Sequence, residues 1–443
     1  MSFLNTLLKP SQFIFYLKKF FLLIFILIIS IAGWFLGQLF FDLSKFSQFI
    51  FDYVLQRSSY NFAYFISSII GALGIISFVG LVLLVGSWVE RRVIAKFQIR
   101  VGPNRVGPFG LLQPIADAVK LMQKEVLVPA IADKTLFLIP PVAIFLPAIL
   151  AWGPIPWAPN MSYLNINVGI LYVFAVSSLT VPIIFFAGWS SMNHYALLGS
   201  MRTVAMMVSY EIPISLSLLS VAIITGTLNF SEIVLWQSTN SIWLGLFMPF
   251  SLFTFFFAST AEINRTPNDI AEAESEIVAG YHIEYSGMKA GLFMAVELGN
   301  AVLLGALVTS LFLNGWFLFG IEKIVPPYII FIGKTVAVYL LLIWLRATFP
   351  RFRLDQLMNF AWKTLIPVSI INFFVIAIEV TIINQFNSTG IVIYIFALFN
   401  IVLFLGLIIV WSKLFSVDKF QPEKIQPKFA SKIGGLKAMK GMK

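Results

Sequence analysis

The chain has 443 residues, of which 59% are hydrophobic and only 11% are charged, and its formal net charge is +10. Soluble domains contain about 25% charged residues, so this composition excludes a soluble globular protein and predicts a polytopic membrane protein. The chain has no cysteine, which excludes disulfides, thiolate nucleophiles and any cysteine-ligated iron–sulfur cluster within it.

Ten apolar runs approach the length of about 20 residues that a helix needs to cross a bilayer core. They lie at 20–41, 62–86, 135–153, 168–188, 204–226, 243–261, 290–313, 329–346, 364–384 and 390–411. Ten spans place both termini on one side, and 26 of the 30 Lys and Arg residues then lie on that side, against three on the other. Because inner loops are enriched in Lys and Arg, we predict an all-α protein with both termini inside. Topology and anionic lipid then explain the positive charge, and no nucleic-acid partner is expected.

The loop after the second span, 87–134, is long and charged. Its GPNRVGP sequence breaks any helix, and apolar residues between 111 and 122 then recur at helical spacing. Asp117 and Lys120 fall on the opposite, polar side, which predicts an amphipathic helix at the membrane interface or over a cavity. From the pattern alone, Asp117 is interpreted as a solvated residue, and Glu90-Arg91-Arg92 as an interfacial charge cluster.

Acidic residues are concentrated between two later spans. Six of the twenty lie in the stretch EINRTPNDIAEAESEIVAGYHIE, which runs from Glu262 to Glu284. A carboxylate near lipid costs several kcal/mol unless it is paired, protonated or hydrated, so this cluster suggests a site that handles protons or a ligand. The alternative is a solvated loop that happens to be acidic. Glu211, close to Pro213, and Glu297 lie within apolar runs and favour the first interpretation.

Several other motifs support no ligand site. The sequence Gly333-Lys334-Thr335 resembles the end of a phosphate-binding loop, but Tyr328 stands where that loop requires glycine. The two histidines lie between apolar runs, and we expect no bound metal. Glu379 lies in a span without an evident partner and is left unassigned. The group at 346–355 that contains Arg346 is interpreted as a solvated basic rim.

Five long blocks, collinear from about residue 62 to 384, resemble the first membrane-arm subunit of respiratory complex I, the proton-translocating NADH:quinone oxidoreductase. They are VERR with FQIRVGPNRVGPFGLLQPIADAVKLMQKE, INVGILYVFAVSS, GWSSMNHYALLGSMRTVAMMVSYEIP, AEINRTPNDIAEAESEIVAGYHIEYSGMKAG and WLRATFPRFRLDQLMNFAWKTLIPVS. The resemblance implies a core of eight transmembrane helices at 62–385. Residues 1–61 then add one helix before this core, and 386–443 add another helix with a Lys-rich tail.

The resemblance also implies a function. Such a subunit anchors the peripheral arm, forms the membrane entrance of the quinone chamber and begins the charged conduit that couples quinone chemistry to proton translocation. It acts only as part of the enzyme and binds no metal or covalent cofactor. Quinone is its substrate, while NADH, FMN and iron–sulfur clusters belong to partner subunits. The implied partners are soluble quinone-module subunits, small membrane-arm subunits and lipids, in a bacterial plasma membrane or inner mitochondrial membrane.

The resemblance implies two groups of site residues, assigned to this chain by matching motif positions. The quinone-binding group is Arg91, Arg265, Asn268 and Asp269. The proton-path group is Asp117, Glu211, Glu262, Glu272, Glu274, Glu276 and Glu297. Asn268 departs from the family, which usually has Phe there, so an amide replaces an apolar contact with the quinone.

Two other classes of protein are alternatives to a complex I subunit. One is the homologous subunit of a membrane-bound hydrogenase, which the intact acidic loop and the GPNRVGPFGLLQ block disfavour. The other is a free-standing ion transporter, which explains buried carboxylates but leaves the large basic loop at 87–134 without a purpose. The set of co-purifying chains discriminates among the three.

Overall fold

The computed structural model describes residues 60–159, 161–269, 280–318, 320–386 and 391–414, together with positions 52 and 55. Within these residues the secondary structure is helical, with one isolated bridge between Ala158 and Met161. The first expected span, 20–41, lies outside the described residues.

Every span expected from residue 62 onward coincides with one helix or with two consecutive helices. These are α2 (Tyr60–Phe97), α4 (Lys134–Ala143) with α5 (Phe145–Leu150), α6 (Gly169–Ser178) with α7 (Thr180–Ser190), α8 (His194–Thr225), α10 (Leu244–Phe247) with α11 (Pro249–Glu262), α13 (Met288–Phe312), α14 (Pro327–Thr348), α16 (Ile366–Phe386) and α17 (Ile391–Leu414). Six helical segments of the described residues are long and apolar enough to cross a membrane, and shorter apolar helices accompany them. The chain is therefore a helical integral membrane protein.

Local sequence signals set the ends of these helices. Asn193 begins α8 by accepting a hydrogen bond from the backbone N–H of Tyr195, and Gly226 ends it in the left-handed conformation, with φ of 69°. Asp133 begins α4 in the same way, accepting from two backbone N–H groups. Helices α4 and α8 thus begin at polar capping residues, and α8 ends at a glycine.

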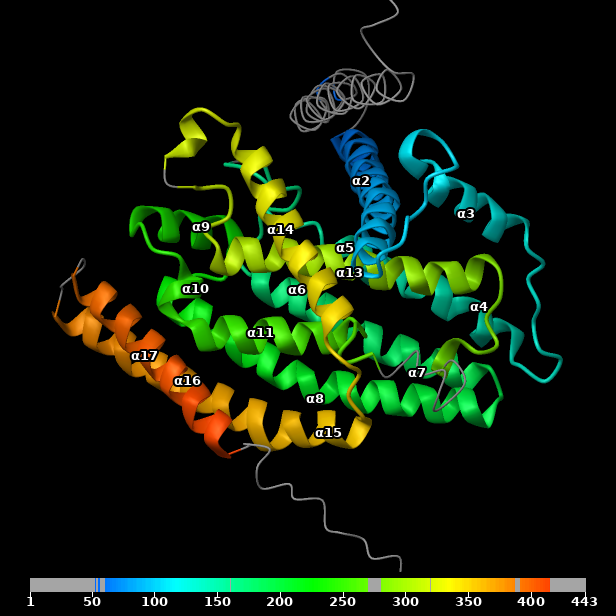
Figure 1. The fold of residues 1–443 in the computed structure, drawn as a ribbon. Helices are drawn as coiled ribbons and strands as arrows, with labels where there is room; N and C mark the ends of the chain where they lie inside the picture. Colours follow the sequence, from blue (N-terminus) through cyan, green and yellow to red (C-terminus); the bar gives the residue numbers. More distant parts are fainter. Residues whose placement is uncertain are drawn as a thin grey trace, which may run out of the picture.

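The middle of the bundle is built around α8 and α13. Helix α8 packs against α7, α11 and α16, while α13 packs against α2 and α14. In Figure 1, α8, α11 and α13 run through the centre of the molecule, and α16 and α17 form a pair along one edge. The core between these helices is apolar and contains large rings such as Trp152, Tyr210 and Phe312.

The predicted amphipathic helix is confirmed as α3 (Gln113–Gln123), which contacts α2 and α13. Its apolar residues Ile115, Val119 and Met122 are exposed. An exposed apolar stripe of this kind suits a helix that lies on lipid.

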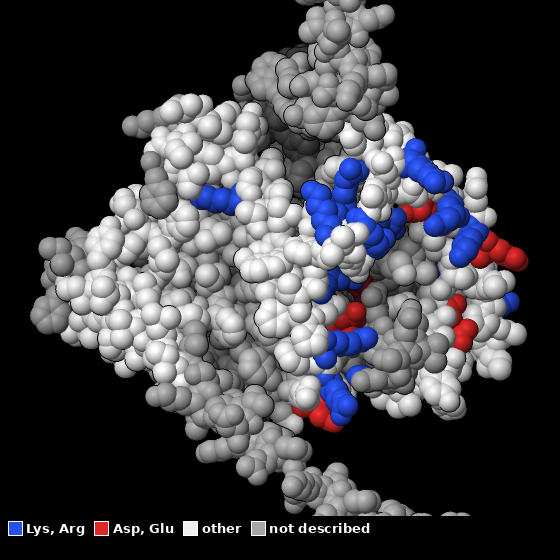
Figure 2. Space-filling model, viewed as in Figure 1, with Lys and Arg blue, Asp and Glu red and all other residues white. Residues whose placement is uncertain are grey.

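Charged residues gather at one end of the molecule. Figure 2 shows Lys, Arg, Asp and Glu crowded on the side where α3 and α4 lie, whereas the opposite side of this view is mostly uncharged. We call residues 87–134, 262–269, 280–289 and 346–355 the charged end. Residues 226–244 and 313–327, at the other ends of the same helices, are called the far end.

Candidate functional site

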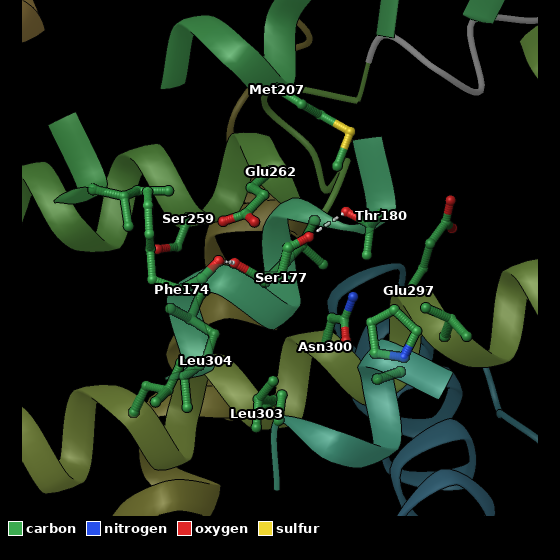
Figure 3. Close-up of a pocket in the computed structure, with 18 of the residues that line it drawn as sticks. Phe174, Ser177, Thr180, Met207, Ser259, Glu262, Glu297, Asn300, Leu303 and Leu304 are labelled. Atoms are coloured by element: carbon green, nitrogen blue, oxygen red, sulfur yellow. Dashed lines mark hydrogen bonds between the residues drawn. The ribbon is translucent and has the colours of Figure 1, made fainter. Parts of the chain in front are cut away.

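A cavity between α5, α6, α8, α11 and α13 brings two of the predicted proton-path residues together. Glu262, the last residue of α11, and Glu297, on α13, both line it. Ser177 and Asn300 add polar groups to walls that are otherwise mostly apolar, as Figure 3 shows. The hydroxyl of Tyr281 donates to Oε1 of Glu297 at 3.3 Å. Hydroxyl and amide groups between two carboxyls are suited to hold water molecules that relay protons.

Glu211 does not line this cavity but lies near Glu262. It is half-buried on α8, two residues before Pro213, and its charge is close enough to act on Glu262. Helix α8 packs along α11, which brings the carboxyl-bearing segments of these two helices into the same part of the bundle. Glu262 and Glu297 thus share the cavity, and Glu211 lies outside it on the neighbouring helix α8.

A second charged cluster joins three segments that are far apart in the sequence. Glu90, on α2, is only 6% exposed and accepts hydrogen bonds from the guanidinium groups of Arg265 and Arg346. The hydroxyl of Tyr339 lies 3.3 Å from Oε2 of Glu90 and 3.2 Å from the carbonyl oxygen of Gly86. Two cations against one buried carboxylate compensate the cost of removing it from water.

This cluster corrects two interpretations drawn from the sequence. Glu90 is a buried partner of Arg265 and not a routine interfacial charge, and Arg346 is partly buried against it and not a solvated rim residue. The sequence offers one indication of these contacts: all three residues lie at or next to those ends of apolar runs that are expected on the inner side of the membrane. The sequence gives no distance between those ends, so the ion pairs were missed.

A third cluster surrounds Asp117 on α3. Arg91 donates to this carboxylate, the ammonium group of Lys120 lies 3.1 Å from Oδ1, and Gln113 donates to the same oxygen at 3.3 Å. Partial burial raises the pKa of Asp117, but hydrogen bonds from Arg91 and Lys120 outweigh it and hold the pKa below its ordinary value. Asp117 is therefore an ionised partner of Arg91, and it is not among the residues that line the cavity beside Glu262.

The GPNRVGP loop is folded by contacts from α2. Arg92 donates to the carbonyl oxygens of Pro103 and Phe109, and the indole N–H of Trp88 donates to the latter at 3.1 Å. A Cβ on Gly110, whose φ is +76°, would lie 2.2 Å from the carbonyl oxygen of Pro103, so only glycine fits there. Arg91 lines a hollow of about 740 Å³ that this loop encloses at the charged end.

The two remaining quinone-group residues lie in the loop after α11. Asn268 is fully buried, and its amide donates to the hydroxyl of Thr260 at 3.2 Å. Asp269 lies 3.7 Å from a guanidinium nitrogen of Arg351. Burial lowers the pKa of His282, and the negative charge of Asp269 opposes this shift.

Three predicted residues of the acidic loop, Glu272, Glu274 and Glu276, lie outside the described residues. The segment resumes at η2 (Gly280–His282) and packs onto α7 and α8. Tyr285 also fastens the segment to α4, because its ring stacks on Phe137 with 4.2 Å between centroids. Burial raises the pKa of Tyr285 to about 12, so its hydroxyl stays protonated and lies 3.4 Å from that of Ser190.

Comparison with known proteins gives one consistent family. The profile of the family described as NADH dehydrogenase matches residues 70–377. The H subunit of NADH-quinone oxidoreductase from Dehalococcoides mccartyi (strain CBDB1) is 47% identical over 77% of this chain and 93% of its own. The H subunits from Rickettsia typhi (strain Wilmington) and Rickettsia rickettsii (strain Iowa) are 46% and 43% identical, over 64% and 74% of this chain and 85% and 98% of theirs. The chain therefore belongs to the NADH dehydrogenase family, which contains the H subunits of NADH-quinone oxidoreductases.

Proposed function

We propose that this chain is the membrane subunit of an NADH:quinone oxidoreductase that forms the entrance of the quinone chamber and begins the proton-coupling conduit. The observation that carries the proposal is the cavity that Glu262 and Glu297 both line, close to the charged end. The names of the curated relatives supply the reaction, the oxidation of NADH by quinone. Because the chain has no cysteine, iron–sulfur clusters with thiolate ligands belong to partner subunits in this proposal.

The charged end is the proposed contact with the soluble subunits and with the quinone headgroup. Arg91, Arg265, Asn268 and Asp269 all lie on its segments, and mixed charge suits a polar protein interface better than lipid contact. Quinone takes up two electrons and two protons when it is reduced, so negative charge develops near these residues during turnover. A guanidinium held in place, such as that of Arg265, stabilises such charge without having to reorganise.

The Glu90 cluster offers a physical link between quinone reduction and the proton path. Arg265 is separated from Glu262 by only two residues and is bound to Glu90. If negative charge at the quinone draws Arg265 away from Glu90, the short segment that joins Arg265 to Glu262 has to move as well. The proposed coupling is therefore a shift of Arg265 between two anionic partners, which changes the field at Glu262.

The proton path then runs laterally through the bundle, from Glu262 to Glu297, with Glu211 as a neighbouring site. Asp117, Glu272, Glu274 and Glu276 complete the proposed group. The proposed topology has ten spans with both termini on the side of the charged end, because that end contains most of the Lys and Arg residues. Residues 1–61 and 386–443 are the proposed additions to the eight-helix core at 62–385.

Substitution of the cavity carboxyls in the assembled complex tests this proposal. Glu262→Gln and Glu297→Gln should each lower quinone-linked proton translocation at least about tenfold, because an amide cannot take up and release a proton in this range. Reconstituted vesicles with a pH-sensitive dye give the translocation rate, and native gels give the amount of complex.

Glu232→Gln is the matched control, because Glu232 is an exposed carboxylate on α9 (Phe230–Thr239) at the far end. It should leave translocation unchanged. Full translocation in both cavity variants would remove these glutamates from the path. A nickel–iron subunit among the co-purifying chains would instead assign the chain to a hydrogenase.

A further inference from the structure

The C-terminal end of α13, the helix that contains Glu297, is fastened by a buried glutamine. Gln237, on α9, is fully buried, and its Nε2 donates to the carbonyl oxygens of Ser310 and Leu311, both at 3.2 Å. Its Oε1 accepts from the backbone N–H groups of Leu244 at 3.2 Å and Asn314 at 3.0 Å. A helix end leaves its last carbonyls without partners, and Gln237 satisfies two of them with its full set of donors.

Lys334 binds the residues that directly follow α13. The ammonium group of Lys334, on α14, donates to the carbonyl oxygens of Leu313, Gly315 and Phe317 at 2.7, 3.0 and 2.6 Å. It also lies 5.2 Å from the ring centroid of Trp243. The side chain in the Gly333-Lys334-Thr335 motif therefore binds backbone carbonyls of its own chain and uses all three of its donors.

These contacts lie directly beyond the cavity that contains the glutamates. Leu307 is the last residue of α13 that lines the cavity, and Ser310, which Gln237 binds, is one helical turn further on. Phe255 also lines the cavity, and its ring packs against Phe312 with 5.6 Å between centroids. The cavity thus ends at apolar side chains, and the hydrogen bonds of Gln237 and Lys334 hold the next turn of α13 in place.

We propose that Lys334 and Gln237 form a seal at the far end of the bundle, which keeps the cavity beside Glu262 and Glu297 closed to water on that side. Protons then exchange with these glutamates only from the charged end or laterally. The ammonium group, held by three carbonyl oxygens, adds an electrostatic barrier to protons. This inference rests on the proton path proposed above.

Passive proton leak through the resting complex is the test, because it requires no turnover. An imposed pH gradient across vesicles that contain the intact complex, with valinomycin and K⁺ to prevent charge build-up, should collapse at least about threefold faster for Lys334→Met. Lys334→Arg keeps the charge and several donors and should leak like the wild type. Lys363→Met is the matched control, because it removes an exposed lysine on η4 (Ala361–Leu365), outside the seal.

Two further variants keep the proposal open to refutation. Gln237→Met should also raise the leak, and it replaces Lys334→Met if the latter fails to assemble. In the double variant Lys334→Met with Glu262→Gln, the leak should fall back toward the wild-type rate, because the glutamate relay is interrupted.

An assembled Lys334→Met or Gln237→Met complex with a wild-type leak would overturn the seal. A leak that persists unchanged in the double variant would do the same, because the opened route would then bypass the glutamates. These outcomes differ from failure of the proposed function, which would appear as normal translocation in Glu262→Gln and Glu297→Gln.

Discussion

Two glutamates of this protein are buried to a similar degree but have different partners. Glu90, 6% exposed, is bound by the guanidinium groups of Arg265 and Arg346 at the charged end. Glu379, 3% exposed on α16, accepts a hydrogen bond from the amide of Asn400 on α17 at 2.9 Å. Among the ion pairs of the described residues, none includes Glu379.

The difference separates an ionic cluster from a hydrogen-bonded pair, Glu379 with Asn400, which we call the clasp. Glu90 lies within the part of the chain that the family profile matches, and it joins segments that carry proposed site residues. Glu379 lies two residues beyond that match, and its partner Asn400 also donates to the carbonyl oxygen of Phe247 at 3.0 Å. The clasp therefore fastens α17, which lies beyond the residues that the family profile matches, to α10 and α16.

The largest expected effect comes from removing the charge of the ionic cluster. Glu90→Gln leaves Arg265 and Arg346 as buried or partly buried cations without their carboxylate, which should destabilise the charged end by about 3–5 kcal/mol. The amount of assembled complex and its thermal unfolding temperature measure this loss. Asp355→Asn is the matched control, because Asp355 is an exposed carboxylate in α15 (Leu354–Phe360) at the same end. A Glu90→Gln complex as stable as the Asp355→Asn complex would contradict the ionic role of Glu90.

A smaller effect is expected at the clasp formed by Glu379 and Asn400. Glu379→Leu removes the acceptor of Asn400 and should cost about 1–2 kcal/mol, whereas Glu379→Gln keeps an acceptor oxygen and should cost less than about 0.5 kcal/mol. Thermal unfolding of the purified complex distinguishes the two. Equal losses in both variants would mean that Glu379 needs its carboxyl group, and the contrast with Glu90 would fail.

The same comparison explains what could be predicted from the sequence. Helices follow from local hydropathy, so the apolar runs at 62–86 and 290–313 correctly predict α2 and α13. The partners of Glu90 lie 175 and 256 positions away, and nothing in the local pattern around Glu90 specifies how α2, α11 and α14 are packed. Lys334 shows the same limit, because its three acceptors are backbone carbonyls, which any sequence provides.

Local sequence pattern and family resemblance lead to different interpretations of the same residue, Asp117. Pattern alone treated Asp117 as solvated, whereas the structure places it in a cluster with Arg91 and Lys120. The resemblance assigned Arg91 to the quinone group and Asp117 to the proton path. The ion pair between Arg91 and Asp117 connects the quinone-binding group with the proton-path group. No sequence motif predicts this contact.

The last prediction concerns quinone preference at Asn268, a buried amide whose backbone N–H donates to the carbonyl oxygen of Arg265. Thr260→Val removes the acceptor of the Asn268 amide without adding bulk and should cost about 1 kcal/mol. Asn268→Phe restores the residue usual in the family, but it also adds volume at a fully buried position, where overpacking costs about 1–3 kcal/mol. If position 268 contacts the quinone tail, Asn268→Phe should lower the apparent KM for long-tailed quinones more than for short, water-soluble analogues, and Thr260→Val should not. Equal effects of Asn268→Phe on both quinone classes would place Asn268 in the packing of the loop against α11. Asn268 would then have a structural role like that of Glu379, through one buried side-chain hydrogen bond, although it lies close to the ion pair of Glu90 and Arg265.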